Sequence, residues 1–217
     1  MKRWFITGTD TEIGKTRIAC DLVRLLAARG ERVAAMKPVA SGCVPTAAGL
    51  RSDDALQLMR AMNVAMPYAQ VNPYAYEPPI APHIAALRAG RMPDPGRISA
   101  IADGIAADHL VIEGVGGWCV PLTEHLMLAD LVRALQASVI LVVGMRLGCI
   151  NHALLTARQI DRDGCALAGW IANRVDPGMQ EYANNLKTLE KQLPAPLWAE
   201  VPWAGNLTEI KAEMVST

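Results

Sequence analysis

The strand-to-helix transition at residues 2–16, KRWFITGTDTEIGKT, constrains the fold more than any other stretch of the chain. The run WFIT is typical of a buried strand, and RIACDLVRLLAARG is typical of an amphipathic helix that ends at Gly30. A glycine-containing loop between two such elements directs backbone N–H groups inward, and the helix start adds the positive end of its dipole. The segment therefore predicts a site for the phosphates of a nucleotide.

The loop ends in Gly14, Lys15 and Thr16, which have distinct roles in loops of this kind. The lysine reaches the β- and γ-phosphates, and the threonine hydroxyl ligates Mg²⁺. The usual pattern has a glycine at the position that is Thr9 here; because the glycine of this chain is Gly8, the loop is a variant. The alternative is a chance GKT in an ordinary strand–turn–helix, which the flanking strand and helix disfavour.

The composition fits one α/β domain and argues against several function classes. The chain has 217 residues, 52% of them hydrophobic, but no apolar run reaches the roughly 18 residues that a membrane span requires. Its start, MKRWFIT, reads as a strand and not as a signal peptide. Lys+Arg and Asp+Glu balance at 21 each, so charge gives no reason to expect nucleic acid or a membrane as partner. Five cysteines without a CxxC spacing predict reduced thiols in or near core elements of a cytoplasmic protein, with no disulfide framework or zinc site.

Strands and helices are predicted to alternate along the whole chain. Further strands are expected at 31–39, 109–114, 138–144, 166–175 and 196–203. Helices are expected at about 53–62 (with Asp53, or its neighbour Ser52, as N-cap), 82–90, 96–107, 149–164 and 178–193, and an extended surface segment over 67–82. This order predicts a single-domain, doubly wound α/β fold over residues 1–217 with a mostly parallel sheet, and ligands at the carboxyl ends of its strands.

Polar candidates fall at four of these strand ends: 7–16, 37–41, 113–117 and 173–176. Glu113 closes an apolar strand, where a carboxylate commonly makes the second contact to nucleotide-bound magnesium; the alternative is a strand-terminal acid before a flexible turn. Asp54, taken alone, reads more readily as a first-turn acid than as a ligand, with Asp53 as its competitor. Lys37, taken alone, reads as a strand-end lysine whose ammonium reaches water.

Taken together, these segments resemble the dethiobiotin synthetase family, which has the fold of P-loop NTPases. The resemblance rests on TGTDTEIGKT (7–16), KPVASG (37–42), LRSDDAL (50–56), EGVGGW (113–118), VILVVGMRLGCINHALLT (139–156), GWIAN (169–173) and PAPLWAEVPW (194–203). KPVASG and LGCINHALLT are far more specific than the phosphate loop. Val115 departs from the family's EGAGG and adds bulk near the phosphates, and the matches over 177–193 and after Trp203 are loose.

The resemblance implies an enzyme of biotin biosynthesis, a ligase that forms C–N bonds. The substrates would be 7,8-diaminononanoate, CO₂ and ATP with Mg²⁺: a carbamate forms, ATP phosphorylates it, and the second amine closes the ring. It further implies a homodimer whose active site is shared across the interface. Lys15 and Lys37 would be catalytic, and with the family in view Asp54 is favoured as a metal ligand beside Thr16 and Glu113.

The remaining site residues follow from the same resemblance. Thr11 and Ser41 would position the amine or carbamate, and Asn173 is suited to read the N6/N7 edge of adenine. The expected nucleotide-binding residues are Glu12, Ile13, Gly14, Lys15, Thr16, Arg17, Asp54, Glu113, Gly114, Val115, Gly116, Asn173, Arg174, Pro202, Trp203 and Ala204. The expected substrate-binding residues are Thr11, Ser41, Gly117, Cys149, Ile150 and Asn151.

Three alternatives remain open from the residues. Another ATP-dependent ligase of this fold would share the loop and the acids, but would not need KPVASG and LGCINH together. A partition-type regulatory ATPase would carry a second lysine where this chain has Asp10. The run 173–176, NRVD, matches the guanine-reading N-[KR]-x-D spacing and keeps a GTP-driven switch in view, with Pro177 and the other motifs against it. His152 and His83 are interpreted as capping or structural residues.

Overall fold

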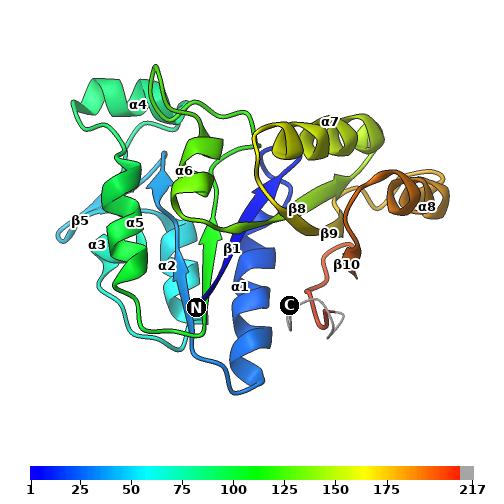
Figure 1. Ribbon diagram of the computed structural model, residues 1–217, viewed down its shortest axis with the longest axis horizontal. Coiled ribbons are helices and arrows are strands. Elements are labelled where there is room, and N and C mark those ends of the chain that lie inside the picture. Colours follow the sequence, from blue (N-terminus) through cyan, green and yellow to red (C-terminus); the bar gives the residue numbers. More distant parts are fainter. Residues whose placement is uncertain (211–217) are drawn as a thin grey trace.

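The computed structural model, which describes residues 1–210, is built on a six-stranded parallel sheet with the order β10–β9–β8–β1–β7–β2. Figure 1 shows this sheet through the middle of the molecule with helices on both sides. The strands are β1 (Lys2–Gly8), β2 (Val33–Met36), β7 (His109–Glu113), β8 (Ser138–Met145), β9 (Leu167–Arg174) and β10 (Leu197–Val201). The doubly wound α/β fold predicted from the sequence is therefore confirmed.

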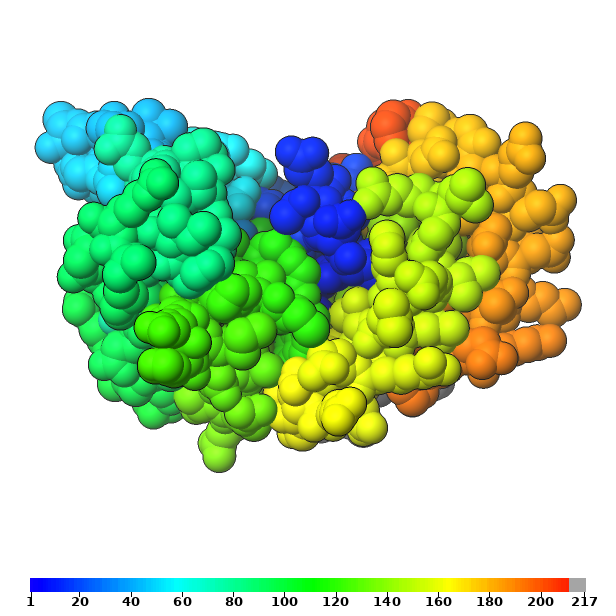
Figure 2. Space-filling model, turned by 90° about the horizontal axis from the view of Figure 1, so that it is seen from above, coloured from blue at the N-terminus to red at the C-terminus, as the bar shows by residue number. Residues whose placement is uncertain are grey.

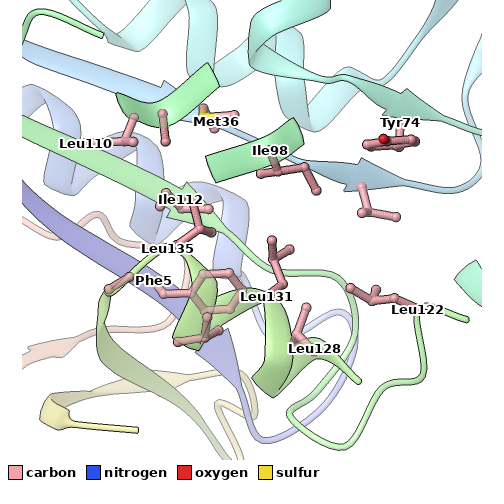
Figure 3. Packing of buried hydrophobic residues seen from close by; sticks show 14 of the residues in the cluster. Phe5, Met36, Tyr74, Ile98, Leu110, Ile112, Leu122, Leu128, Leu131 and Leu135 are labelled. Atoms are coloured by element: carbon pink, nitrogen blue, oxygen red, sulfur yellow. The ribbon is translucent and has the colours of Figure 1, made fainter. Parts of the chain in front are cut away.

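The alternation of side chains along β1 divides the core between the two faces of the sheet. Trp4 and Ile6 pack with the apolar stripe of α1 (Lys15–Ala28), and Phe5 points to the opposite face. There it packs with residues of α5 (Pro95–Asp103) and α6 (Leu128–Ala134), as Figure 3 shows for Ile98, Leu128 and Leu131. Farther along the sheet, α7 (Cys149–Arg162) and α8 (Tyr182–Gln192) cover β8 and β9.

The predicted extended segment at 67–82 is wrong in its detail. It contains α3 (Tyr68–Val71) and β6 (Tyr74–Ala75), which pairs with β3 (Val39–Ala40), and then the start of α4 (Pro82–Ala89). Val71, Asn72 and Tyr76 are buried, because this segment packs beneath the end of β2 and is not a surface crossing. The segment is rich in proline and tyrosine, and a helix as short as α3 has too few residues to show a hydrophobic periodicity.

Other differences are smaller. The helix expected at 96–107 ends at Asp103, α6 was not predicted, and the loop before α2 (Asp53–Ala61) contains a hairpin of β4 (Val44–Thr46) and β5 (Gly49–Arg51). Ser52 is the N-cap of α2. All five cysteines are free, but Cys119 is exposed, contrary to the expectation that every cysteine would lie in or near the core. In residues 1–210 no helix has the length and apolarity needed to cross a membrane.

The strand order places the ligand crevice. Chain connections run from β1 to β2 on one side, with β7 inserted between them, whereas β8 lies on the other side of β1. Such a reversal opens a crevice at the carboxyl end of the central strand. The loop after β1, at residues 9–14, occupies this position.

Candidate functional site

A cavity of about 660 Å³ lies at the carboxyl edge of the sheet. In Figure 2 the blue N-terminal residues are visible at the surface, between light-blue and cyan residues on one side and yellow-green residues on the other. Segments remote in sequence thus meet here, as expected from the strand ends. The cavity is lined by Thr11, Glu12, Gly14, Lys15, Thr16, Lys37, Ala40, Ser41, Asp54, Pro79, Glu113, Val115 and Gly116.

Two glycines allow the loop after β1 to fold tightly. Gly14 has φ +84°, a left-handed conformation that glycine adopts without strain, and a Cβ there would lie 2.6 Å from Asn173 Nδ2. A Cβ on Gly8 would lie 2.6 Å from Cδ1 of Ile13, whose side chain is buried. Gly8 therefore makes room for the loop's apolar anchor, one residue before the usual glycine position.

A buried ammonium joins the two candidate metal ligands. Lys37 Nζ lies 2.7 Å from Glu113 Oε1 and 2.8 Å from Asp54 Oδ2, and also donates to the carbonyl of Gly114 at 2.9 Å. Thr16 Oγ1 lies 3.0 Å from Asp54 Oδ1 and 2.7 Å from Glu113 Oε1. The ends of β2 and β7, the first turn of α1 and the first turn of α2 thus converge on one polar cluster.

Charge and burial shift the pKa of each group in this cluster. Burial alone would lower the pKa of Lys37, but the carboxylates of Glu113 and Asp54 more than offset it and raise the pKa above its usual value. Burial would raise the pKa of Asp54, yet the Lys37 charge holds it below the usual range. Burial raises the pKa of the fully enclosed Glu113 more than Lys37 lowers it. Lys37 is therefore a cation held by acidic oxygens.

Lys15 is the second buried cation of the site. Its ammonium donates to the carbonyl of Asp10 at 2.6 Å, so that it turns back onto its own loop. Burial, together with the nearby charge of Lys37, lowers the pKa of Lys15 to about 8. An anion placed in the cavity would restore the stability of its charged form.

The donor set fits magnesium held partly by a nucleotide. Glu113 is 1% exposed and its Oε2 has no hydrogen-bond partner, so one carboxylate oxygen remains available. No cluster of three or more His, Cys, Asp or Glu that could form a protein-only metal cage occurs in residues 1–210. Two carboxylates and the Thr16 hydroxyl form an oxygen site of the kind Mg²⁺ occupies when phosphates and water supply its other ligands.

The predicted base reader contacts the phosphate loop. Asn173, 1% exposed at the end of β9, donates from Nδ2 to the carbonyl of Ile13 at 2.6 Å and accepts from Arg17 Nη2 at 2.6 Å. The neighbouring Arg174 is held elsewhere, because its guanidinium stacks on Tyr182 and donates to the carbonyl of Pro177.

The remaining predicted residues lie outside the cavity lining. Pro202, Trp203 and Ala204 follow β10, and Trp203 is 53% exposed and does not belong to the core. Gly114 packs against the Phe5 ring and Gly117 near the Gly8 carbonyl. The run Cys149, Ile150 and Asn151 forms the first turn of α7, with Asn151 exposed.

Several supporting residues escaped the sequence reasoning. Asn72 Nδ2 donates to the Lys37 carbonyl at 2.6 Å, and Asp10 forms an ion pair with Arg146 of the β8–α7 loop. Ala40 and Pro79 complete the cavity wall. For Asn72, the one local signal is the Asn-Pro pair at 72–73, which is typical of a turn. No local pattern could reveal the Asp10–Arg146 ion pair, because the two residues lie far apart in the sequence.

Comparison with solved structures identifies the fold. MinD of Pyrococcus horikoshii, solved with Mg-ADP, aligns with TM-score 0.58 at 15% identity and covers 93% of this chain and 81% of that one. FtsY of Thermotoga maritima aligns with TM-score 0.56 at 14% identity, covering 97% and 64%. At such identities the likeness shows the P-loop NTPase fold alone.

Sequence comparison narrows the assignment. A family model described as an AAA domain matches residues 2–211. An ATP-dependent dethiobiotin synthetase BioD of Pseudomonas aeruginosa is 53% identical over 205 residues, covering 93% of this chain and 90% of the relative. The BioD 1 protein of Escherichia coli K12 is 47% identical over 210 residues, covering 96% and 93%. The chain is therefore an enzyme of the ligase class and belongs to the ATP-dependent dethiobiotin synthetase family.

Proposed function

We propose that residues 1–217 act as one ligase domain that closes 7,8-diaminononanoate and CO₂ to dethiobiotin with ATP and Mg²⁺, in the cytoplasm. The observation that carries the proposal is the convergence of Lys15, Lys37, Thr16, Asp54 and Glu113 on one cavity. Two anions must meet there, a carbamate and a triphosphate, and they repel each other in water. Two buried ammonium groups and a metal site offset that repulsion.

The phosphate loop and the acids would hold the nucleotide's charged end. Backbone N–H groups of residues 12–17 and the Lys15 ammonium would bind the phosphates. Thr16, Asp54 and Glu113 would hold Mg²⁺, which when bound neutralises phosphate charge and polarises the transferring phosphoryl group. Gly114, Val115 and Gly116 would lie against the phosphates, with Val115 narrowing the space.

Lys37 would act on the reacting atoms. One amine of the diamine attacks CO₂ and loses a proton, which gives a carbamate. A carbamate oxygen then attacks the γ-phosphorus as ADP leaves, and the second amine attacks the resulting mixed anhydride, closes the ring and expels phosphate. The ammonium of Lys37, which lines the cavity, would contact the carbamate and the transferring group and stabilise the charge that builds between them.

Polar groups in the cavity wall would position the diamine. Ser41 Oγ is buried without a hydrogen-bond partner although its residue lines the cavity, which supports a role in binding substrate. Thr11 and the backbone of Gly117 would complete this contact. Asn173 would read adenine, with Arg17, Arg174, Pro202, Trp203 and Ala204 around the base and sugar.

We further propose a homodimer in which the partner's α7 start, at Cys149, Ile150 and Asn151, receives the substrate carboxylate. Two observations support it. These residues do not line the cavity of their own chain, and Leu147 just before them is 94% exposed, with Leu155 on α7 57% exposed. Free N–H groups at a helix start bind carboxylates, and the proposed interface would cover these two exposed leucines.

Mass analysis of the reaction tests the proposal directly. Purified protein is incubated with 7,8-diaminononanoate, bicarbonate and Mg-ATP, and dethiobiotin and phosphate are measured together. We expect equal amounts of both products, and neither from a Lys37→Ala variant that keeps its melting temperature. Lys187→Ala, which removes an exposed lysine of α8, is the matched control and should remain active. Phosphate release that does not depend on the diamine would instead indicate an ATPase of the same fold.

A further inference from the structure

The side chain of Arg17 forms a contact that the proposed chemistry does not require. Its Nη2 donates to Asn173 Oδ1 at 2.6 Å, across 156 positions of sequence, and its Nε is buried without a hydrogen-bond partner. Within residues 1–210 no carboxylate forms an ion pair with it. The first turn of a helix carries the positive end of the helix dipole, so a cation there destabilises the helix. The stability of α1 therefore does not explain why an arginine stands at position 17.

Two neighbours fix which way the Asn173 amide points. The Ile13 carbonyl can only accept, so the atom 2.6 Å from it must be the NH₂ group. The Arg17 guanidinium can only donate, so the atom facing it must be the oxygen. The close approach of Nδ2 over Gly14 leaves the side chain little room to move aside.

The fixed amide retains one lone pair on Oδ1 and one N–H on Nδ2. Adenine offers the complementary pair on its N6/N7 edge, an amino donor beside an acceptor. A 6-oxopurine has acceptors at both positions, so its O6 would face the amide oxygen. Flipping the amide would not relieve this contact, because the amide oxygen would then face N7, which also accepts. The flip would also set the NH₂ group against the Arg17 donor and the oxygen against the Ile13 carbonyl.

We infer that Arg17 is a positioning residue for base selectivity: it holds the Asn173 amide in the one orientation that pairs with adenine, whereas a 6-oxopurine meets an acceptor–acceptor contact in either orientation. Because selectivity is a difference between two affinities, a fixed amide favours ATP while the affinity for a 6-oxopurine nucleotide stays nearly the same. The inference rests on the proposed role of Asn173 in reading the base.

The test compares the dissociation constants of ATP and ITP, measured by calorimetry with Mg²⁺ present and no diamine. ITP differs from ATP at the purine 6-position and adjacent N1 and lacks the 2-amino group of GTP, so it isolates the edge that Asn173 would read. Arg17→Met keeps the aliphatic bulk and removes the donor. We expect its preference for ATP over ITP to fall about fivefold, the weight of one ordinary hydrogen bond.

Arg60→Met, which removes an exposed arginine of α2, is the matched control and should keep the wild-type preference. Equal weakening of both nucleotides by Arg17→Met, or no change in either, would overturn the inference. A wild-type protein that binds ATP and ITP with equal affinity would overturn the role of Asn173 in reading the base. A wild-type preference for ATP that Arg17→Met leaves unchanged would overturn only the role of Arg17. Should Arg17→Met lower the melting temperature, Arg17→Gln carries the same expectation, because its amide can donate or accept and enforces neither orientation.

Discussion

At the scale of single residues, Lys37 is the counter-ion of both Asp54 and Glu113. Its ammonium lies within 2.8 Å of an oxygen of each. We expect Lys37→Met to reduce kcat at least a hundredfold, because charge on the transferring group loses a stabilising cation. We also expect nucleotide-free Lys37→Met protein to bind Mn²⁺ more tightly than wild type, measured by electron paramagnetic resonance, since the acids are then uncompensated. Weaker Mn²⁺ binding in a folded Lys37→Met variant would contradict this interpretation of the cluster.

Lys15 gives the site a pH dependence with a defined sign. Burial and the charge of Lys37 lower its pKa to about 8 in the free protein, and bound phosphate would raise it. Binding above pH 8 must then take up a proton, so ATP affinity should be greatest below pH 8 and fall, by up to about tenfold per unit, as pH rises through 8. Calorimetry from pH 7 to 9 in buffers of different ionisation enthalpy measures both effects. Lys15→Arg, which does not titrate there, should show a flat profile.

At the scale of elements, α2 carries Asp54 in its first turn and depends on its cap. Ser52 Oγ accepts from the Ala55 N–H at 3.4 Å, and the Ser52 N–H is bonded to the Tyr68 hydroxyl. We expect Ser52→Ala to lower the free energy of unfolding by about 1 kcal/mol in urea titrations. We also expect it to raise the Mg²⁺ concentration needed for half-maximal activity, because Asp54 is held less firmly. Thr188→Ala on the exposed face of α8 should change stability by less than about 0.5 kcal/mol. Equal losses of unfolding free energy in the two variants would contradict a capping role for Ser52.

Elements also show where sequence reasoning succeeds and fails. The strands ending at Gly8, Glu113 and Arg174 were found from apolar runs, because buried parallel strands are apolar on both faces. The short helix α3 and the α6 helix were missed, since four and seven residues carry too little periodicity to detect. Asp54 taken alone reads as a first-turn acid, and the family resemblance is what favours it as a ligand; the structure places it against Thr16 and Lys37.

At the scale of the whole molecule, the proposed dimer predicts a single sensitive side chain. Leu147 is 94% exposed beside the start of α7. We expect Leu147→Glu to convert the protein to a monomer in size-exclusion chromatography with light scattering, and to raise KM for the diamine strongly while ATP affinity stays near wild type. Val44→Glu, on the exposed β4–β5 hairpin, is the control and should remain dimeric. A wild-type monomer with full activity would remove the shared-site proposal.

The sequence by itself determined the fold class, the phosphate loop and the strand ends that carry polar residues, because these follow from patterns a few residues long. Only the tertiary structure decided how those ends meet. The contact between Lys37 and Glu113 spans 76 positions and that between Asn173 and Ile13 spans 160. Such pairs exist because β7 lies between β1 and β2 and β9 follows β8 in the sheet. Strand order is set by packing of the whole chain, so no local pattern contains it.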